Sequence, residues 1–210
     1  MATSASVTAS PITDRGLLTI PNLISIGRLA CAPLFLWLLF GVDDRAAAAW
    51  LLAFLGATDW VDGYIARHFN QVSDVGKILD PTADRVLLLV GVAAIAIDGA
   101  VPTWVAAATL LREGLIAVAA LAIAAAGARR MEVRWVGKAG TFGMLIAFPL
   151  FLASHSDLSW HEIARPLAWI AVIPGLVFGW IAAAAYVPDA RRAVIEGRAA
   201  RRAEQEEAAK

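Results

Sequence analysis

The sequence predicts an all-α membrane protein with six transmembrane helices. Hydrophobic residues make up 60% of the 210 residues, a larger share than ordinary soluble domains contain. Six apolar segments follow one another, and each is near the ~20 residues that cross ~30 Å of hydrocarbon as a helix. No sheet signal or internal repeat is evident along the chain.

The predicted helices are separated by short polar or charged stretches. They cover residues 20–40, 46–69, 78–97, 101–126, 139–153 and 167–187. The fifth is short, and we expect it to extend back through Val136. Residues 1–17 are read as a flexible lead that is not a cleaved signal peptide, because no basic start precedes an apolar core. Residues 18–187 then form the membrane domain, and residues 188–210 form a charged cytoplasmic tail.

Basic residues are distributed unevenly, although the formal net charge of the chain is zero. With the N-terminus cytoplasmic, the outer connections hold only Arg45 and Arg165, and the other lysines and arginines outside the spans fall on the inner side. This pattern predicts a multi-pass protein of the inner or plasma membrane with both termini cytoplasmic. We expect no nucleic-acid partner.

Four aspartates interrupt the apolar sequence of the second and third segments. Asp59 and Asp62 are three residues apart, and Asp80 and Asp84 are four apart, so each pair projects from one face of a helix. Two facing helices could therefore close four carboxylates around one small volume. Such oxygen ligands suit Mg²⁺, Mn²⁺ or Ca²⁺, and they could hold two ions ~3.5–4 Å apart, an arrangement that clamps phosphoryl groups.

The depth of these aspartates predicts a cavity. About a dozen apolar residues separate Asp59, and likewise Asp84, from the nearest outer connection, which gives ~18 Å of helix in each case. Neither run crosses the bilayer alone, so the helices continue through their aspartates, ~10 Å inside the cytoplasmic boundary of a ~30 Å core. A polar cavity open to the cytoplasm and the inner leaflet would admit a water-soluble substrate and a lipid tail.

A longer motif contains the four aspartates. It reads Asp59-x2-Asp62-Gly63-x2-Ala66-Arg67-x8-Gly76-x3-Asp80-x3-Asp84. This spacing resembles, position for position, the signature of the CDP-alcohol phosphatidyltransferases. Residues 19–28 and the triplet Thr58-Asp59-Trp60 also resemble that family, and the resemblance covers about residues 18–186.

The resemblance implies a role for each motif residue. Two divalent cations, Mg²⁺ or Mn²⁺, would hold the pyrophosphate of CDP-diacylglycerol, with Asp59, Asp62 and Asp80 as ligands and Asp84 as ligand and general base. The residues expected to bind the CDP part are Gly63, Ala66, Arg67, Gly76 and Asn22. Gly63 and Ala66 would leave a groove for cytidine, and Arg67 would pair with phosphate through its planar fork. The active site would be cytoplasmic, and the protein a homodimer, as is usual in the family.

Four basic residues are candidates for binding a lipid or glycerol phosphate acceptor: Lys138, Arg112, Arg129 and Arg134. Lys138 is favoured because Gly137-Lys138 resembles the family's Gly-Lys element before the fifth span. Positive-inside topology alone also explains much of the basic cluster at 129–138. Arg112 and Glu113 are adjacent on a predicted helix, so we expect them to have different partners.

The acceptor is predicted from a departure from the family pattern. Phosphatidylglycerol-phosphate synthases usually carry a second lysine after the Gly-Lys element, whereas this chain has Gly140 at that place. A phosphomonoester brings more charge than a phosphodiester, so fewer basic contacts favour phosphatidylglycerol as acceptor and cardiolipin as product. The alternative acceptor is glycerol 3-phosphate, and the neighbouring arginines would compensate for the missing lysine.

Two other interpretations of the aspartates are weaker. An ion-pair network with Arg67 and Arg85 would leave four carboxylates balanced by only two cations at membrane depth. A cation transporter would place its acids near the midplane between repeats, whereas these acids all lie towards one face.

Overall fold

The computed structural model describes residues 20–69, 76–125 and 135–208, and every regular element in these ranges is helical. There are six α-helices in the described ranges, and a π-helical turn, η1 (Trp37–Gly41), continues the first of them. The bounds are α1 Ile20–Leu36, α2 Arg45–Phe69, α3 Gly76–Asp98, α4 Thr103–Ala125, α5 Trp135–Ala153 and α6 His161–Ala208. The all-helical class and the order of the six predicted helices are confirmed.

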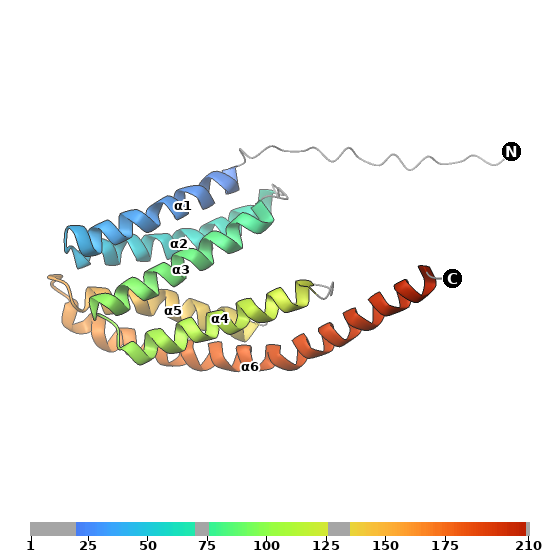
Figure 1. Cartoon of the computed structure of the whole chain (residues 1–210). Coiled ribbons are helices and arrows are strands. Elements are labelled where there is room, and N and C mark those ends of the chain that lie inside the picture. Colours follow the sequence, from blue (N-terminus) through green and yellow to red (C-terminus); the bar gives the residue numbers. More distant parts are fainter. Residues whose placement is uncertain (1–19, 70–75, 126–134, 209–210) are drawn as a thin grey trace.

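The helices lie roughly along one direction, and the short connections gather at one end. The connections α1/α2, α3/α4 and α5/α6 all lie at the left of Figure 1, and we call this the connection end. The start of α1, the end of α2 and the start of α3 lie at the opposite end (Figure 1). Helix α1 packs against α3, α2 against α5, and both α4 and α5 against α6.

Local interactions explain where α2 begins. The π-helical turn closes with the amide of Val42 donating to the carbonyl of Trp37 at 3.0 Å. Gly41 permits this turn, because a Cβ there would lie 2.8 Å from Cδ1 of Trp37. Asp44 then caps α2, since its Oδ1 accepts from the amide of Ala47 at 2.8 Å. The first span therefore ends and the second begins within a few residues.

Helices α5 and α6 are joined by four glycines that bring their backbones into contact. A Cβ at Gly140 would lie 2.6 Å from the amide nitrogen of Gly179, and one at Gly143 would lie 2.9 Å from Cα of Gly175. Small residues allow this close approach in membrane helices, where packing replaces the hydrophobic effect as the main driving force. The α5–α6 contact is the most extensive one among the described helices.

Helices α5 and α6 are both longer than the apolar segments 139–153 and 167–187. Helix α5 begins at Trp135, so its expected extension back through Val136 is confirmed. Helix α6 starts at His161, six residues before the predicted segment, and it continues past residue 187 to Ala208 without a break. The predicted tail thus starts as the continuation of the last predicted span.

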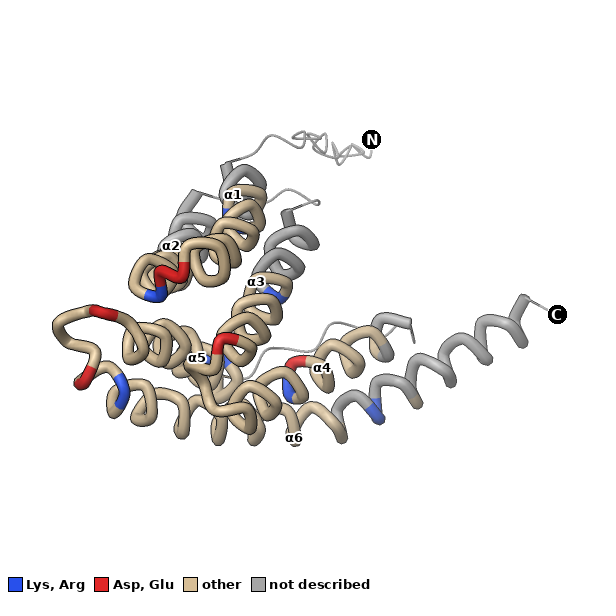
Figure 2. The backbone as a smooth tube through the Cα atoms, turned by 60° about the vertical axis from the view of Figure 1, so that its left-hand side comes forward, with Lys and Arg blue, Asp and Glu red and all other residues tan. Residues whose placement is uncertain are grey.

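Length and composition mark several described helices as membrane-spanning candidates. Three stretches are long and apolar enough, Thr103–Leu121, Trp135–Ala153 and His161–Pro188, and shorter apolar stretches cover Ile26–Gly41 and Arg45–Thr58. Large apolar side chains on α4 point outwards, including Leu111, Val118 and Leu121. Figure 2 shows few charged residues along the middle of the described helices, while several acidic residues lie at the connection end. These surfaces suit a hydrocarbon environment.

Candidate functional site

The motif aspartates lie on two consecutive helices at the end opposite the connections. Asp59 and Asp62 belong to the second half of α2, and Asp80 and Asp84 belong to the first three turns of α3. Their backbones are helical, which is the condition under which residues three or four apart share a face. The side chains of all four lie outside the described part of the structure, so their convergence on one volume stays a prediction.

An ion pair at the connection end sets the relative depth of the two acidic segments. Nη2 of Arg45, the first residue of α2, lies 2.9 Å from Oδ1 of Asp98, the last residue of α3. Nε of the same arginine donates to Oδ2 of Asp98 at 3.1 Å. The carboxylate of Asp98 is only 5% exposed, so the paired fork of Arg45 compensates for its burial. The first turn of α2 and the last turn of α3 are therefore held level with each other.

Asp59 and Asp84 lie at equal distances along their own helices from this ion pair. Asp59 follows Arg45 by 14 residues, and Asp84 precedes Asp98 by 14 residues. At ~1.5 Å of rise per residue, each position lies ~21 Å along its helix from the residue of the ion pair on that helix. The sequence interpretation treated Arg45 only as an outer charge and missed this contact, which no local pattern could reveal.

Arg112 is buried between helices, and its environment corrects one expectation. Its side chain is 4% exposed, Nη1 is paired with the carboxylate of Glu113, and Nε donates to the carbonyl of Gly179 at 3.4 Å. The expectation that Arg112 and Glu113 would need different partners is therefore wrong. The arginine side chain is long enough to bend back to its neighbour. Gly179 is needed here as well, because a Cβ there would lie 3.2 Å from Nε of Arg112.

The structure describes the side chain of Lys138, only the backbone of several other predicted site residues, and neither for Arg129 and Arg134. Lys138 is exposed in the first turn of α5, next to Gly137, which is buried against Ala182. For four predicted CDP-binding residues the structure describes the helical backbone and nothing further: Asn22 on α1, and Gly63, Ala66 and Arg67 on α2. Gly76 is the first residue of α3. Arg129 and Arg134 lie outside the described residues.

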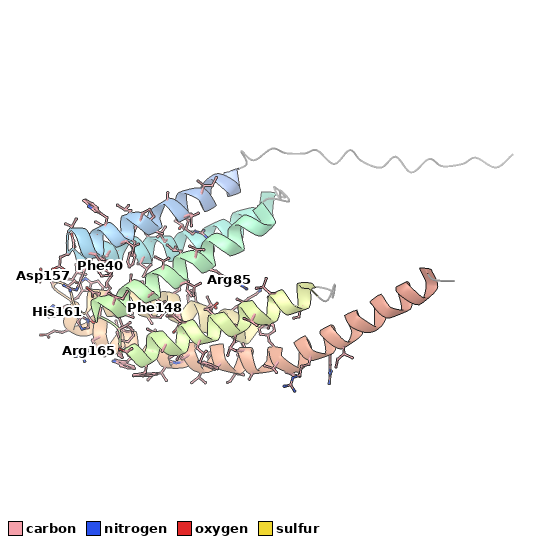
Figure 3. The ribbon with its side chains drawn as sticks, in the orientation of Figure 1. Phe40, Arg85, Phe148, Asp157, His161 and Arg165 are labelled. Carbon is pink, nitrogen blue, oxygen red and sulfur yellow. The ribbon has the colours of Figure 1, made fainter. Side chains whose placement is uncertain are left out.

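Arg85 directly follows Asp84 on α3 and is exposed (Figure 3). The labelled Asp157, His161 and Arg165 all lie at the connection end, far along the bundle from Arg85 (Figure 3). These charged groups of the α5/α6 connection are therefore separate from the candidate site.

The donor set of the motif fits a hard divalent cation. Four carboxylates supply only oxygen atoms, which Mg²⁺, Mn²⁺ and Ca²⁺ prefer. Among the side chains that the structure describes, no group of three or more His, Cys, Asp or Glu residues comes together. The described part therefore offers no competing metal centre, and the motif remains the candidate.

Comparison with known proteins identifies what the chain is similar to. A family model described as CDP-alcohol phosphatidyltransferase matches residues 18–188. This match includes the whole aspartate motif, Lys138 and most of the described helices.

Several named relatives match most of the chain. A protein of Streptomyces coelicolor named cardiolipin synthase (CMP-forming) is 36% identical over 187 residues, which cover 87% of this chain and 86% of the relative. A putative cardiolipin synthase of Mycobacterium tuberculosis is 33% identical and covers 79% of each chain. A Bacillus subtilis protein named CDP-diacylglycerol–glycerol-3-phosphate 3-phosphatidyltransferase is 31% identical over 78% of this chain and 93% of the relative.

Proposed function

Because the chain belongs to the CDP-alcohol phosphatidyltransferase family, we propose that it is a cardiolipin synthase that uses CDP-diacylglycerol and releases CMP. The transferase class follows from the family. The acceptor is inferred to be phosphatidylglycerol, and the single observation that carries this choice is the likeness, over 87% of the chain, to a relative named cardiolipin synthase.

The basic residues near α5 support the same acceptor. The Gly137-Lys138 element is followed by Ala139 and Gly140, so one lysine stands where a phosphomonoester acceptor would favour two. The phosphodiester of phosphatidylglycerol carries one charge and needs fewer basic contacts. Lys138 is exposed at the start of α5 and is therefore available to such a phosphate. Arg112, Arg129 and Arg134 complete the proposed acceptor site.

Glycerol 3-phosphate is the second candidate acceptor. The Bacillus subtilis relative is named for that substrate, and this chain covers 93% of its length. The acceptor therefore has to be decided by assay.

We propose that Asp59, Asp62, Asp80 and Asp84 hold two divalent cations, Mg²⁺ or Mn²⁺. Bound cations neutralise the pyrophosphate of CDP-diacylglycerol and stabilise the departing CMP. Gly63 and Ala66, one turn apart on α2, leave room for the cytidine. The other proposed CDP-binding residues lie near the helix ends opposite the connection end: Asn22 near the start of α1, Arg67 near the end of α2 and Gly76 at the start of α3. The equal sequence distances of Asp59 and Asp84 from the Arg45–Asp98 pair support their action on one substrate.

Asp84 is the proposed general base. Its carboxylate accepts the proton of the acceptor hydroxyl while the hydroxyl oxygen attacks the phosphorus that carries diacylglycerol. The bond from that phosphorus to the CMP oxygen breaks, and CMP leaves. The proton passes to Asp84 and the phosphatidyl group to the acceptor, so the transfer is balanced.

We place all six helices across the plasma membrane, with residues 18–187 as the membrane domain, residues 1–17 as a lead and residues 188–210 as a cytoplasmic tail. The connection end then faces outwards, since Arg45 and Arg165 are the only lysines or arginines among its described residues, as the positive-inside rule expects. The candidate site opens to the cytoplasm, ~9 Å inside a ~30 Å core when measured from the Arg45–Asp98 pair. A homodimer is proposed from the family alone.

Lipid analysis of purified protein tests the proposal. The protein is given CDP-diacylglycerol and Mg²⁺ with phosphatidylglycerol in one reaction and glycerol 3-phosphate in another. We expect CMP and cardiolipin in the first reaction. Phosphatidylglycerol phosphate in the second reaction, with no product in the first, would instead establish the alternative acceptor.

A further inference from the structure

An apolar groove runs between α2 and α5 from the neighbourhood of the motif towards the connection end. Its volume is ≈ 680 Å³, within the ~300–1,000 Å³ of small-molecule sites. Residues of α2 from Ala49 to Ala57 form one wall, and residues of α5 from Phe142 to Ala153 form the other. The lining consists of alanine, glycine, proline, aliphatic and aromatic residues, so its surface is almost entirely apolar and suits a hydrocarbon ligand.

The groove begins close to the proposed metal ligands and ends at two tryptophans. Ala57, at its inner end, precedes Asp59 by two residues on the same helix. Trp50 and Trp160 lie at the other end and pack edge to face, with ring centroids 6.1 Å apart at 69°. Trp160 belongs to the connection between α5 and α6, so the end of the groove is formed by both α2 and this connection.

The depth of the site explains why a lipid tail would reach this groove. In an ordinary leaflet an acyl chain extends ~15 Å from the boundary to the midplane. A donor whose pyrophosphate lies at Asp59, ~9 Å inside the boundary, carries its chain ends a similar distance past the midplane. Ala57 and Ala49 lie ~18 Å and ~6 Å from the Arg45 end of α2, so the groove occupies that part of the membrane.

We propose that this groove holds the distal part of one acyl chain of CDP-diacylglycerol, and that Trp50 and Trp160 form an end wall that limits the chain length. The proposal rests on the proposed function, because it needs the donor headgroup at the α2 aspartates. The donor is chosen over the acceptor because the same helix carries both Asp59 and one wall of the groove. Its new content is the fit between a headgroup that lies below the membrane surface and a groove that extends across the midplane.

Filling the groove tests the proposal by its dependence on chain length. Ala53 lines the middle of the groove, so a ring in Ala53→Phe would occupy the space of the acyl chain. We expect kcat/KM for a dipalmitoyl donor to fall at least about tenfold, while a dibutanoyl donor, whose chains span only about half of the ~9 Å between Asp59 and Ala53, changes less than about twofold. Ala107→Phe, at an exposed alanine of α4 away from the groove, is the matched control and should change neither. Equal losses for both donors, or no loss for either, would overturn the proposal.

Opening the end wall is the complementary test. Replacing both Trp50 and Trp160 by alanine should raise the rate with a dieicosanoyl donor relative to the dipalmitoyl donor. An unchanged ratio with a folded variant would remove the end wall from the proposal. A change of oligomeric state in Ala53→Phe without any chain-length effect would show that a second copy of the chain covers the groove, and this too would overturn it.

A binding measurement separates this inference from the proposed function. A CDP-diacylglycerol with a photoreactive diazirine at the chain terminus should label the peptides around Trp50 and Leu158–Trp160, and unlabelled donor should compete. Labelling of these peptides without turnover would retain the groove assignment and reject the proposed reaction. Labelling elsewhere, or labelling that excess donor does not reduce, would reject the groove assignment even in an active enzyme.

Discussion

Arg45 and Asp98 are joined by two contacts, at 2.9 Å and 3.1 Å, that link the first residue of α2 to the last residue of α3. An aspartate of the motif lies 14 residues from each of them, Asp59 on α2 and Asp84 on α3. We therefore expect this contact at one end of the bundle to influence the alignment of the proposed reaction centre at the other.

Breaking this ion pair should reduce both stability and turnover. Arg45→Gln leaves the nearly buried carboxylate of Asp98 without its fork, and we expect a loss of about 1–3 kcal/mol in stability. The poorer alignment of the α2 aspartates with the α3 aspartates should also reduce kcat. Asp43→Asn is the matched control, because Asp43 lies 3.2 Å from Arg45 but is 74% exposed, and its loss should cost under about 1 kcal/mol. Thermal unfolding in detergent and CMP release measure the two effects, and equal behaviour of the two variants would contradict the prediction.

Removing the proposed base should impair chemistry more than binding. Asp84→Asn keeps the size of the side chain and loses its basicity, so we expect kcat to fall by about 10²–10⁴. Binding of Mn²⁺, followed by its paramagnetic signal, should be largely kept, because three other carboxylates remain. A variant that turns over at the rate of the parent protein would remove Asp84 from this role.

Divalent cations should be required for CMP release. Treatment with a chelator should abolish the reaction, and adding Mg²⁺ or Mn²⁺ should restore it, because the pyrophosphate charge is otherwise not neutralised. Asp59→Asn should raise the concentration of cation needed for half-maximal rate. Undiminished activity in the chelated protein would show that the motif aspartates have another function.

Lys138 should affect the acceptor and not the donor. Lys138→Gln removes an exposed positive charge at the start of α5, so we expect KM for the acceptor to rise about ten- to hundredfold, as a lost charged hydrogen bond would produce. KM for CDP-diacylglycerol should stay the same. Arg165→Gln, at an exposed arginine of the connection end, is the control. A matching rise in both KM values would place Lys138 outside the acceptor site.

The glycine contact between α5 and α6 should tolerate no added methyl group. In Gly143→Ala the new Cβ would lie 2.9 Å from Cα of Gly175, so the backbones must separate, at a cost of about 1–3 kcal/mol in stability. Gly114→Ala on α4 has nothing within 4 Å of the new atom and should be neutral or slightly stabilising. Comparing unfolding temperatures of the two variants is the measurement, and a stable Gly143→Ala would show that the helices can shift freely.

The fold was predictable from the sequence because its signals are local. Runs of about 20 apolar residues located the first five helices to within a few residues, whereas α6 is much longer than its predicted segment, and a fixed aspartate spacing located the motif on α2 and α3. Contacts between distant residues were not predictable in this way. Nothing near Arg45 indicates Asp98 as its partner, and the rule that adjacent helical residues do not face each other failed at Arg112 and Glu113 because a long side chain can fold back. The apolar groove is formed by α2, α5 and the α5/α6 connection together, so the sequence of any single segment does not predict it.

The glycine contact of α5 and α6 has a mechanical consequence. Helices whose main chains touch at Gly140, Gly143, Gly175 and Gly179 have no side-chain layer between them that could yield or repack. The two helices therefore form a close backbone contact at these positions, whereas α2 meets α5 with an apolar groove between them. We expect entry of a bulky lipid to displace α2 from α5 more readily than it separates α5 from α6.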